Sequence, residues 1–181
     1  LVRSFIDGVP GLAAWSMLGK AFFHSSPPSG EPEYDVVVVD AHPEAFDALS
    51  PEYSGFRVFD EDKFAEMVMH FAGSSGAFRT KLNKLLFYAD FLNFKQSAVS
   101  ISGAPYLAFQ RGPVPQHYDW MTEDLEQRGE IQTTEWASGE KSGEIITALR
   151  PADMSVFSEA ERRVLEFVST HFARATSTEL M

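Results

Sequence analysis

The sequence feature that most constrains the fold is the run TKLNKLLFYADFLNF at residues 80–94. At helical spacing its apolar side chains form two adjoining faces. One face carries Leu82, Leu85, Leu86 and Ala89, and the other carries Phe87, Phe91 and Phe94. A helix that is apolar over most of its circumference must be covered by other elements on several sides. The run therefore predicts a central helix around which the rest of the domain packs.

A second helix is predicted directly before the central one. Asp60 is a favourable N-cap, because its carboxylate can accept a hydrogen bond from a free N–H of the first turn. Phe59 and Phe64 have the spacing of a hydrophobic staple across the start of this helix. Gly73 is a suitable terminator.

Further elements are predicted after the central helix. Ser158 and Glu161 form a capping box that starts a helix over residues 158–172. Residues 116–128 have a helical pattern, and residues 130–149 have the pattern of a β-hairpin. Helices and strands do not alternate regularly along the chain. We therefore expect a mainly helical α+β fold with a small β-sheet or hairpin.

The segment SAVSISGAPYLAFQ at residues 97–110 has strand-like composition, and we expect a turn at residues 102–105. It runs into AFQRGPVPQHYDW, where Gly112 permits a sharp turn and two prolines keep the chain extended and stiff. Pro115 also suits the first position of the following helix. This pattern predicts a rigid corner between a strand and a helix.

Residues 1–54 are predicted to be an N-terminal extension, separate from the domain at residues 55–181. The stretch HSSPPSGEPE at residues 24–33 has three prolines and several serines, which is typical of a linker. Nothing in the extension indicates a specific fold or role.

The composition argues against several functions. The formal net charge of −11 opposes binding to nucleic-acid phosphates. The absence of cysteine excludes disulfides and thiolate metal sites. Metal-binding histidine spacing, nucleophile motifs and phosphate-binding glycine loops are also missing, and no apolar run is long enough to cross a membrane. We therefore expect no enzymatic activity, cofactor, metal or membrane contact.

Asp90 is the one carboxylate within the central apolar helix. A carboxylate in such a place is either a structural group that accepts hydrogen bonds from a loop or a functional acid. The structural role is the more frequent, and we expect it here.

Several motifs, taken in order, resemble one known family. They are KLLFYAD at residues 84–90, SISG at residues 100–103, Tyr106, and GPVP at residues 112–115. The chain is similar over about residues 55–180 to the Panacea domain, the SocA-like antitoxin family of phage-associated proteins. The family pattern continues past this point, so we expect a C-terminally truncated domain.

The resemblance implies a cytoplasmic antitoxin that neutralises a cognate protein toxin by direct binding, without enzymatic activity. It leaves two alternatives, a DNA-binding autoregulator of the operon and an adaptor that delivers a toxin to a protease. Residues 1–54 lack a helix-turn-helix pattern, which makes nucleic acid an unfavourable partner for this chain. A homodimer stays open.

Two sets of residues follow from the motifs and from the corner. The motifs imply structural roles for Lys84, Asp90, Ser102, Gly103, Gly112, Pro113 and Pro115. Aromatic and arginine side chains on a rigid corner are suited to binding hot spots. We therefore expect toxin contacts at Tyr88, Arg111, His117, Tyr118 and Trp120.

Overall fold

The structure is a computed structural model that describes residues 54–109, 111–116, 118–139, 141–176 and 179–180. The predicted extension over residues 1–54 therefore lies, except for Ser54, outside the described residues. The described chain is mainly helical with two small antiparallel sheets, which confirms the predicted α+β class.

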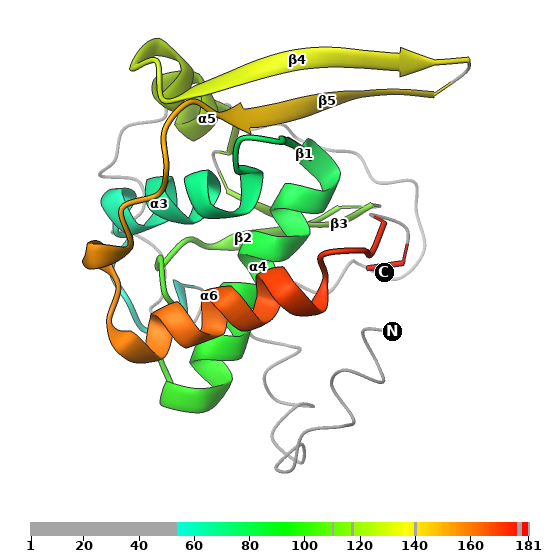
Figure 1. Cartoon of the computed structure of the whole chain (residues 1–181). Coiled ribbons are helices and arrows are strands. Elements are labelled where there is room, and N and C mark those ends of the chain that lie inside the picture. Colours follow the sequence, from blue (N-terminus) through cyan, green and yellow to red (C-terminus); the bar gives the residue numbers. More distant parts are fainter. Residues whose placement is uncertain (1–53, 110, 117, 140, 177–178, 181) are drawn as a thin grey trace, which may run out of the picture.

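Helix α4 (Arg79–Ser97) is the central element of the fold, as the sequence predicts (Figure 1). It contacts helices α3 and α6 and strands β1, β3 and β5. Leu82, Leu86 and Ala89 are completely buried. The helix ends at Ala98, which has a left-handed backbone with φ of 61°.

Helix α3 (Glu61–Ala72) begins and ends where the sequence predicts. The Asp60 side chain accepts a hydrogen bond of 3.0 Å from the Lys63 backbone N–H. At the other end, the Gly73 N–H donates to the carbonyl oxygen of Met69. Local capping thus determines both ends of this helix.

Helices α5 (Tyr118–Gln127) and α6 (Glu159–His171) complete the helical part, together with the short 3-10 helix η4 (Met154–Val156). Both halves of the capping box between Ser158 and Glu161 are present at the start of α6. The two helices confirm the predictions with ends shifted by one to two residues, as is usual for helix ends.

The larger sheet contains the predicted hairpin. Its strands are β1 (Ala77–Phe78), β5 (Lys141–Ala148) and β4 (Ile131–Ser138), in that order across the sheet. All neighbours are antiparallel. Ile131 and Ile146 are completely buried or nearly so. Beyond its contacts with the helices, the β4–β5 hairpin extends past the body of the domain (Figure 1).

The smaller sheet is a hairpin of β2 (Tyr106–Phe109) and β3 (Gly112–Pro115). The strand-like prediction for residues 97–110 is therefore confirmed only at residues 106–109, and the turn predicted at residues 102–105 between two strands is wrong. Residues 100–105 form an irregular loop. The backbone N–H groups of Ile101 and Ser102 donate to the Asp90 carboxylate, so they are not available to a strand ladder.

The two prolines lie within β3 and are compatible with its pairing. The Gln116 N–H donates to the carbonyl oxygen of Pro105 at 2.8 Å, so these two residues form a hydrogen-bonded pair. Every second pair along the hairpin is then hydrogen-bonded, counted from this one. Pro113 and Pro115 then occupy positions whose nitrogen faces away from β2, where proline removes no hydrogen bond. The prediction that Pro115 starts the helix is wrong, because it ends β3 and α5 begins at Tyr118.

Candidate functional site

The Asp90 carboxylate organises the loop that precedes the β2–β3 hairpin. One oxygen accepts hydrogen bonds from the N–H groups of Ile101 and Ser102 at 2.8 and 2.7 Å. The other accepts from the Ser102 hydroxyl at 2.5 Å and the Tyr106 hydroxyl at 2.8 Å. Asp90 is 3% exposed. This is the geometry of a structural carboxylate, since both oxygens are occupied and solvent is excluded.

Burial dominates the electrostatics of this group. It raises the pKa of Asp90 above the ordinary aspartate value, while the hydrogen bonds from Ser102, Tyr106 and Ile101 oppose the rise. Burial and the neighbouring carboxylate also raise the pKa of Tyr106, so its hydroxyl stays protonated and donates. The hydrogen bond between Asp90 and Tyr106 therefore connects α4 to the start of β2.

The β2–β3 hairpin exposes apolar side chains next to the hydrogen bond between Asp90 and Tyr106. Tyr106 is 8% exposed and its ring packs edge-on against Phe87, with centroids 5.2 Å apart. Side chains alternate along a strand, so Leu107 and Phe109 share the face opposite Tyr106. They are 46% and 54% exposed. Arg111, in the turn of the hairpin, is also exposed.

The tip of the hairpin rests on the central helix. Gly112 has φ of 122°, and a Cβ atom added there would lie 2.8 Å from Cε of Lys84. The aliphatic stem of Lys84 therefore lies against the tip, and the positive φ of Gly112 favours glycine at this position. Burial lowers the pKa of Lys84. The motif residues Lys84 and Gly112 thus lie in contact, although 27 residues lie between them in the chain.

The segment at residues 54–60 packs against the other side of the loop. Gly103 has φ of 74°, and an added Cβ would come within 2.6 Å of the Val58 carbonyl oxygen. The Asp60 N–H donates to the Ser102 carbonyl oxygen at 2.8 Å, and the Ser100 N–H donates to that of Gly55 at 2.9 Å. The loop is therefore enclosed between α4 and this segment.

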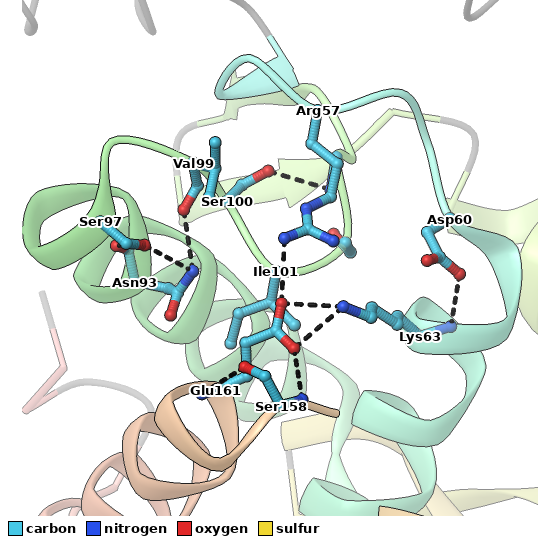
Figure 2. Close-up of polar contacts among 12 residues, drawn as sticks. Arg57, Asp60, Lys63, Asn93, Ser97, Val99, Ser100, Ile101, Ser158 and Glu161 are labelled. Atoms are coloured by element: carbon cyan, nitrogen blue, oxygen red, sulfur yellow. Dashed lines mark hydrogen bonds and ion pairs between the residues drawn. The ribbon is translucent and has the colours of Figure 1, made fainter. Parts of the chain in front are cut away.

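A buried carboxylate, Glu161, joins the same segment to α6 (Figure 2). Its oxygens accept from Arg57 at 3.0 Å, from the Lys63 ammonium at 2.8 and 2.9 Å, and from the Ser158 N–H at 2.8 Å. Burial raises the pKa of Glu161, but these donors outweigh it and hold the pKa below the ordinary glutamate value.

Two of the expected toxin contacts are buried. Tyr88 is 6% exposed, its hydroxyl donates to the Leu180 carbonyl oxygen, and its ring stacks on Phe172 with centroids 4.9 Å apart. Tyr118 is 3% exposed and lies beneath the Arg79 guanidinium, 5.2 Å from the ring centroid. Both side chains pack the domain in this conformation, which leaves little of either for a partner.

The other expected contacts do not form one cluster. Arg111 is exposed in the hairpin turn, whereas Trp120 is half-buried on α5 next to Phe64 and Ala65 of α3. His117 lies outside the described residues. Whether these residues contact a toxin stays a prediction.

Sequence reasoning missed Leu107 and Phe109, the two apolar side chains that the hairpin exposes. The signal was present in the run YLAF at residues 106–109, where strand alternation places both opposite Tyr106. It could be used only once Tyr106 was known to face the core, and that depends on Asp90.

Some kinds of site are not found in the described part of the chain. No group of three or more histidine or acidic side chains there could hold a metal ion. Nor does any helix of that part have the length and apolar character needed to cross a bilayer.

The Asp90 network predicts two graded losses of stability. Asp90→Ala leaves two buried N–H groups without an acceptor and should lower the free energy of unfolding by more than about 3 kcal/mol. Asp90→Asn keeps one acceptor oxygen and should cost less. Urea denaturation of the three proteins measures the order. Equal stability of Asp90→Ala and the parent chain would contradict a structural role.

Gly103 and Gly129 offer a matched comparison, because both have left-handed backbones with φ of 74° and 70°. An added Cβ meets the Val58 carbonyl oxygen at Gly103 but nothing within 4 Å at Gly129. Gly129→Ala should cost about 1 kcal/mol from the backbone alone. Gly103→Ala should cost at least about 2 kcal/mol, because the Val58 backbone must also move. Similar midpoints in thermal denaturation would contradict tight packing at Gly103.

Glu161 predicts acid sensitivity. Its pKa in the folded chain is held below the unfolded value, so its contribution is fully present above the unfolded pKa of about 4.3. That contribution is lost as the pH falls through the folded pKa. The free energy of unfolding, measured from pH 7 to pH 3, should therefore fall less steeply for Glu161→Gln. At pH 7 the variant should be less stable by about 1–3 kcal/mol. If the free energy of unfolding depended on pH in the same way for Glu161→Gln and the parent chain, this contribution of Glu161 to stability would be contradicted.

Comparison with known proteins identifies a family. A family model described as antitoxin SocA-like, Panacea domain, matches residues 82–181. No curated protein and no solved structure matches the chain. The matched range begins within α4 and includes Asp90, the loop at residues 100–105 and the β2–β3 hairpin. The chain therefore belongs to the SocA-like antitoxin family, defined by the Panacea domain.

Proposed function

We propose that this chain is an antitoxin that binds its cognate protein toxin directly in the cytoplasm and neutralises it stoichiometrically, without catalysis. The β2–β3 hairpin is the surface we assign to that contact. The family match supports an antitoxin-type role. The observation that carries the assignment is the exposure of Leu107 and Phe109 on a hairpin whose root is buried.

The hairpin has the physical properties of a binding surface. Its exposed apolar side chains offer area that a partner can remove from water, and Arg111 beside them adds a hydrogen-bonding cation. The hydrogen bond between Tyr106 and Asp90 holds the root, and Lys84 supports Gly112 at the tip. A preorganised hairpin loses little conformational entropy when it binds.

The net charge favours a protein partner over nucleic acid. A chain with a formal charge of −11 is repelled by phosphate backbones and attracted to basic protein surfaces. Toxins that act on nucleic acids need such basic surfaces. Covering one would deny the toxin its substrate, and this is the mode of neutralisation we propose.

A double substitution on the hairpin tests the proposal. Leu107→Ser with Phe109→Ser should weaken binding to the product of the adjacent gene by at least about tenfold and abolish rescue of growth on co-expression. The melting temperature should change little, because both side chains are exposed. Phe167→Ser is a matched control, since Phe167 is 46% exposed on α6.

The outcomes separate two errors. If the parent chain neither binds the adjacent gene product nor rescues growth, the antitoxin function is wrong. If binding and rescue survive the double substitution, the function stands and the toxin binds elsewhere than at Leu107 and Phe109.

A further inference from the structure

Strand β4 forms the outer edge of the larger sheet, and the ladder defines which backbone groups face outward. The Leu149 N–H donates to the Glu130 carbonyl oxygen at 2.8 Å, so this is a hydrogen-bonded pair. In an antiparallel ladder, hydrogen-bonded residue pairs alternate with pairs that are not hydrogen-bonded. Even-numbered residues of β4 therefore bond to β5, and the N–H and C=O groups of odd-numbered residues point away from it.

The hydrogen bonding of β5 is consistent with this alternation. Ala148 pairs with Ile131, an odd-numbered residue, so the Ala148 N–H should point away from β4. The Ala148 N–H does point away, since it donates to the Gly73 carbonyl oxygen at 3.0 Å.

Helix α5 covers the β4 edge only near the start of the strand. The outward N–H of Thr133 donates to a carboxylate oxygen of Glu126 at 2.9 Å. Further along, among the described residues no hydrogen bond reaches the outward backbone groups of Glu135 or Ala137. That stretch lies where the β4–β5 hairpin extends past the helices (Figure 1). Two consecutive outward-facing residues are thus open to an added strand.

The side chains around this open edge indicate what an added strand must carry. Glu135 lies directly opposite Glu144 on β5. Glu144 is paired with Arg79 at 2.9 Å, whereas Glu135 is exposed and has no ion pair within the described residues. On the opposite face Trp136 packs edge-on against Phe78, with centroids 5.2 Å apart. An added strand would therefore meet an acidic face and an aromatic face.

We propose that the toxin adds an extended segment to the β4 edge as a fourth strand of this sheet. The segment carries a basic residue beside Glu135 and apolar or aromatic residues, one position away on either side, beside Trp136. This alternation follows from the two-residue period of a strand. The inference rests on the proposed antitoxin function and supplies a second contact besides the β2–β3 hairpin.

The charge favours a basic partner over a second copy of the chain. Two copies paired through this edge would bring Glu135 of each close to the other, and each chain has a formal charge of −11. Like charges close together across an added strand are unfavourable. A basic strand neutralises Glu135 instead.

Proline at position 137 tests the edge without breaking the hairpin. The Ala137 N–H faces outward, so Ala137→Pro removes no bond to β5, just as Pro113 and Pro115 remove none in β3. Binding to the adjacent gene product should weaken at least about tenfold, with little change in melting temperature. Ala137→Ser, which retains the N–H, should bind like the parent chain.

A charge reversal tests the chemistry of the partner. Glu135→Lys should weaken the complex by about fivefold or more, while Glu123→Lys, an equal change on an exposed residue of α5, should have little effect. Equal effects of the two substitutions would overturn the assignment of a basic residue beside Glu135.

Amide hydrogen exchange distinguishes the edge directly. In the free chain, the Glu135 and Ala137 amides should exchange quickly and the Thr134 and Trp136 amides slowly. Binding should protect Glu135 and Ala137 at least tenfold. If the complex forms without this protection, and Ala137→Pro binds normally, the edge inference is wrong and the antitoxin function stands.

Two other outcomes would also overturn it. Self-association of the parent chain, seen by light scattering and lost in Ala137→Pro, would show that a second copy occupies the edge. Absence of any complex with the adjacent gene product would remove the antitoxin proposal and this inference together.

Discussion

The structure depends on the burial of one carboxylate in the central helix. Asp90 lies between α4 and the loop at residues 100–105, and four donors from Ile101, Ser102 and Tyr106 surround it. An uncompensated carboxylate in this place would be strongly destabilising, and the conformation of the loop supplies the donors that compensate it. Asp90 thus acts on the backbone of residues that lie more than ten positions further along the chain.

The position of the loop determines its neighbours on both sides. Tyr106 leaves the loop as the first residue of β2, and its hydrogen bond to Asp90 aims the β2–β3 hairpin. On the other side, Gly103 lets the backbone of residues 57–58 approach closely. Arg57 then reaches Glu161 and ties this segment to α6. The buried carboxylates of Asp90 and Glu161, with their donors, therefore link three helices to a hairpin.

The two proposed contact regions differ in character. The β2–β3 hairpin offers apolar side chains on a supported frame, and the β4 edge offers backbone hydrogen-bonding groups beside Glu135 and Trp136. Contacts of the first kind stabilise a complex mostly through the apolar area they remove from water, whereas an added strand stabilises it through main-chain hydrogen bonds. A partner that used both would be recognised by shape as well as by charge.

Local signals in the sequence were sufficient for the helices. Asp60 and Ser158 cap α3 and α6 through residues three positions away, and the apolar pattern of residues 80–94 predicts a central helix. Such signals are readable because the interacting residues are neighbours in the chain. The alternation in residues 130–149 was sufficient for the β4–β5 hairpin for the same reason.

The sequence by itself determined the helices, the large hairpin and the family, whereas the tertiary structure decided the loop and the exposed surface. Strand-like residues 100–105 became a loop because Asp90 competes for their N–H groups. Tyr88 and Tyr118 became core residues because Leu180 and Arg79 cover them. These outcomes depend on hydrogen bonds and packing between residues far apart in the chain, and no local pattern encodes which distant groups will meet.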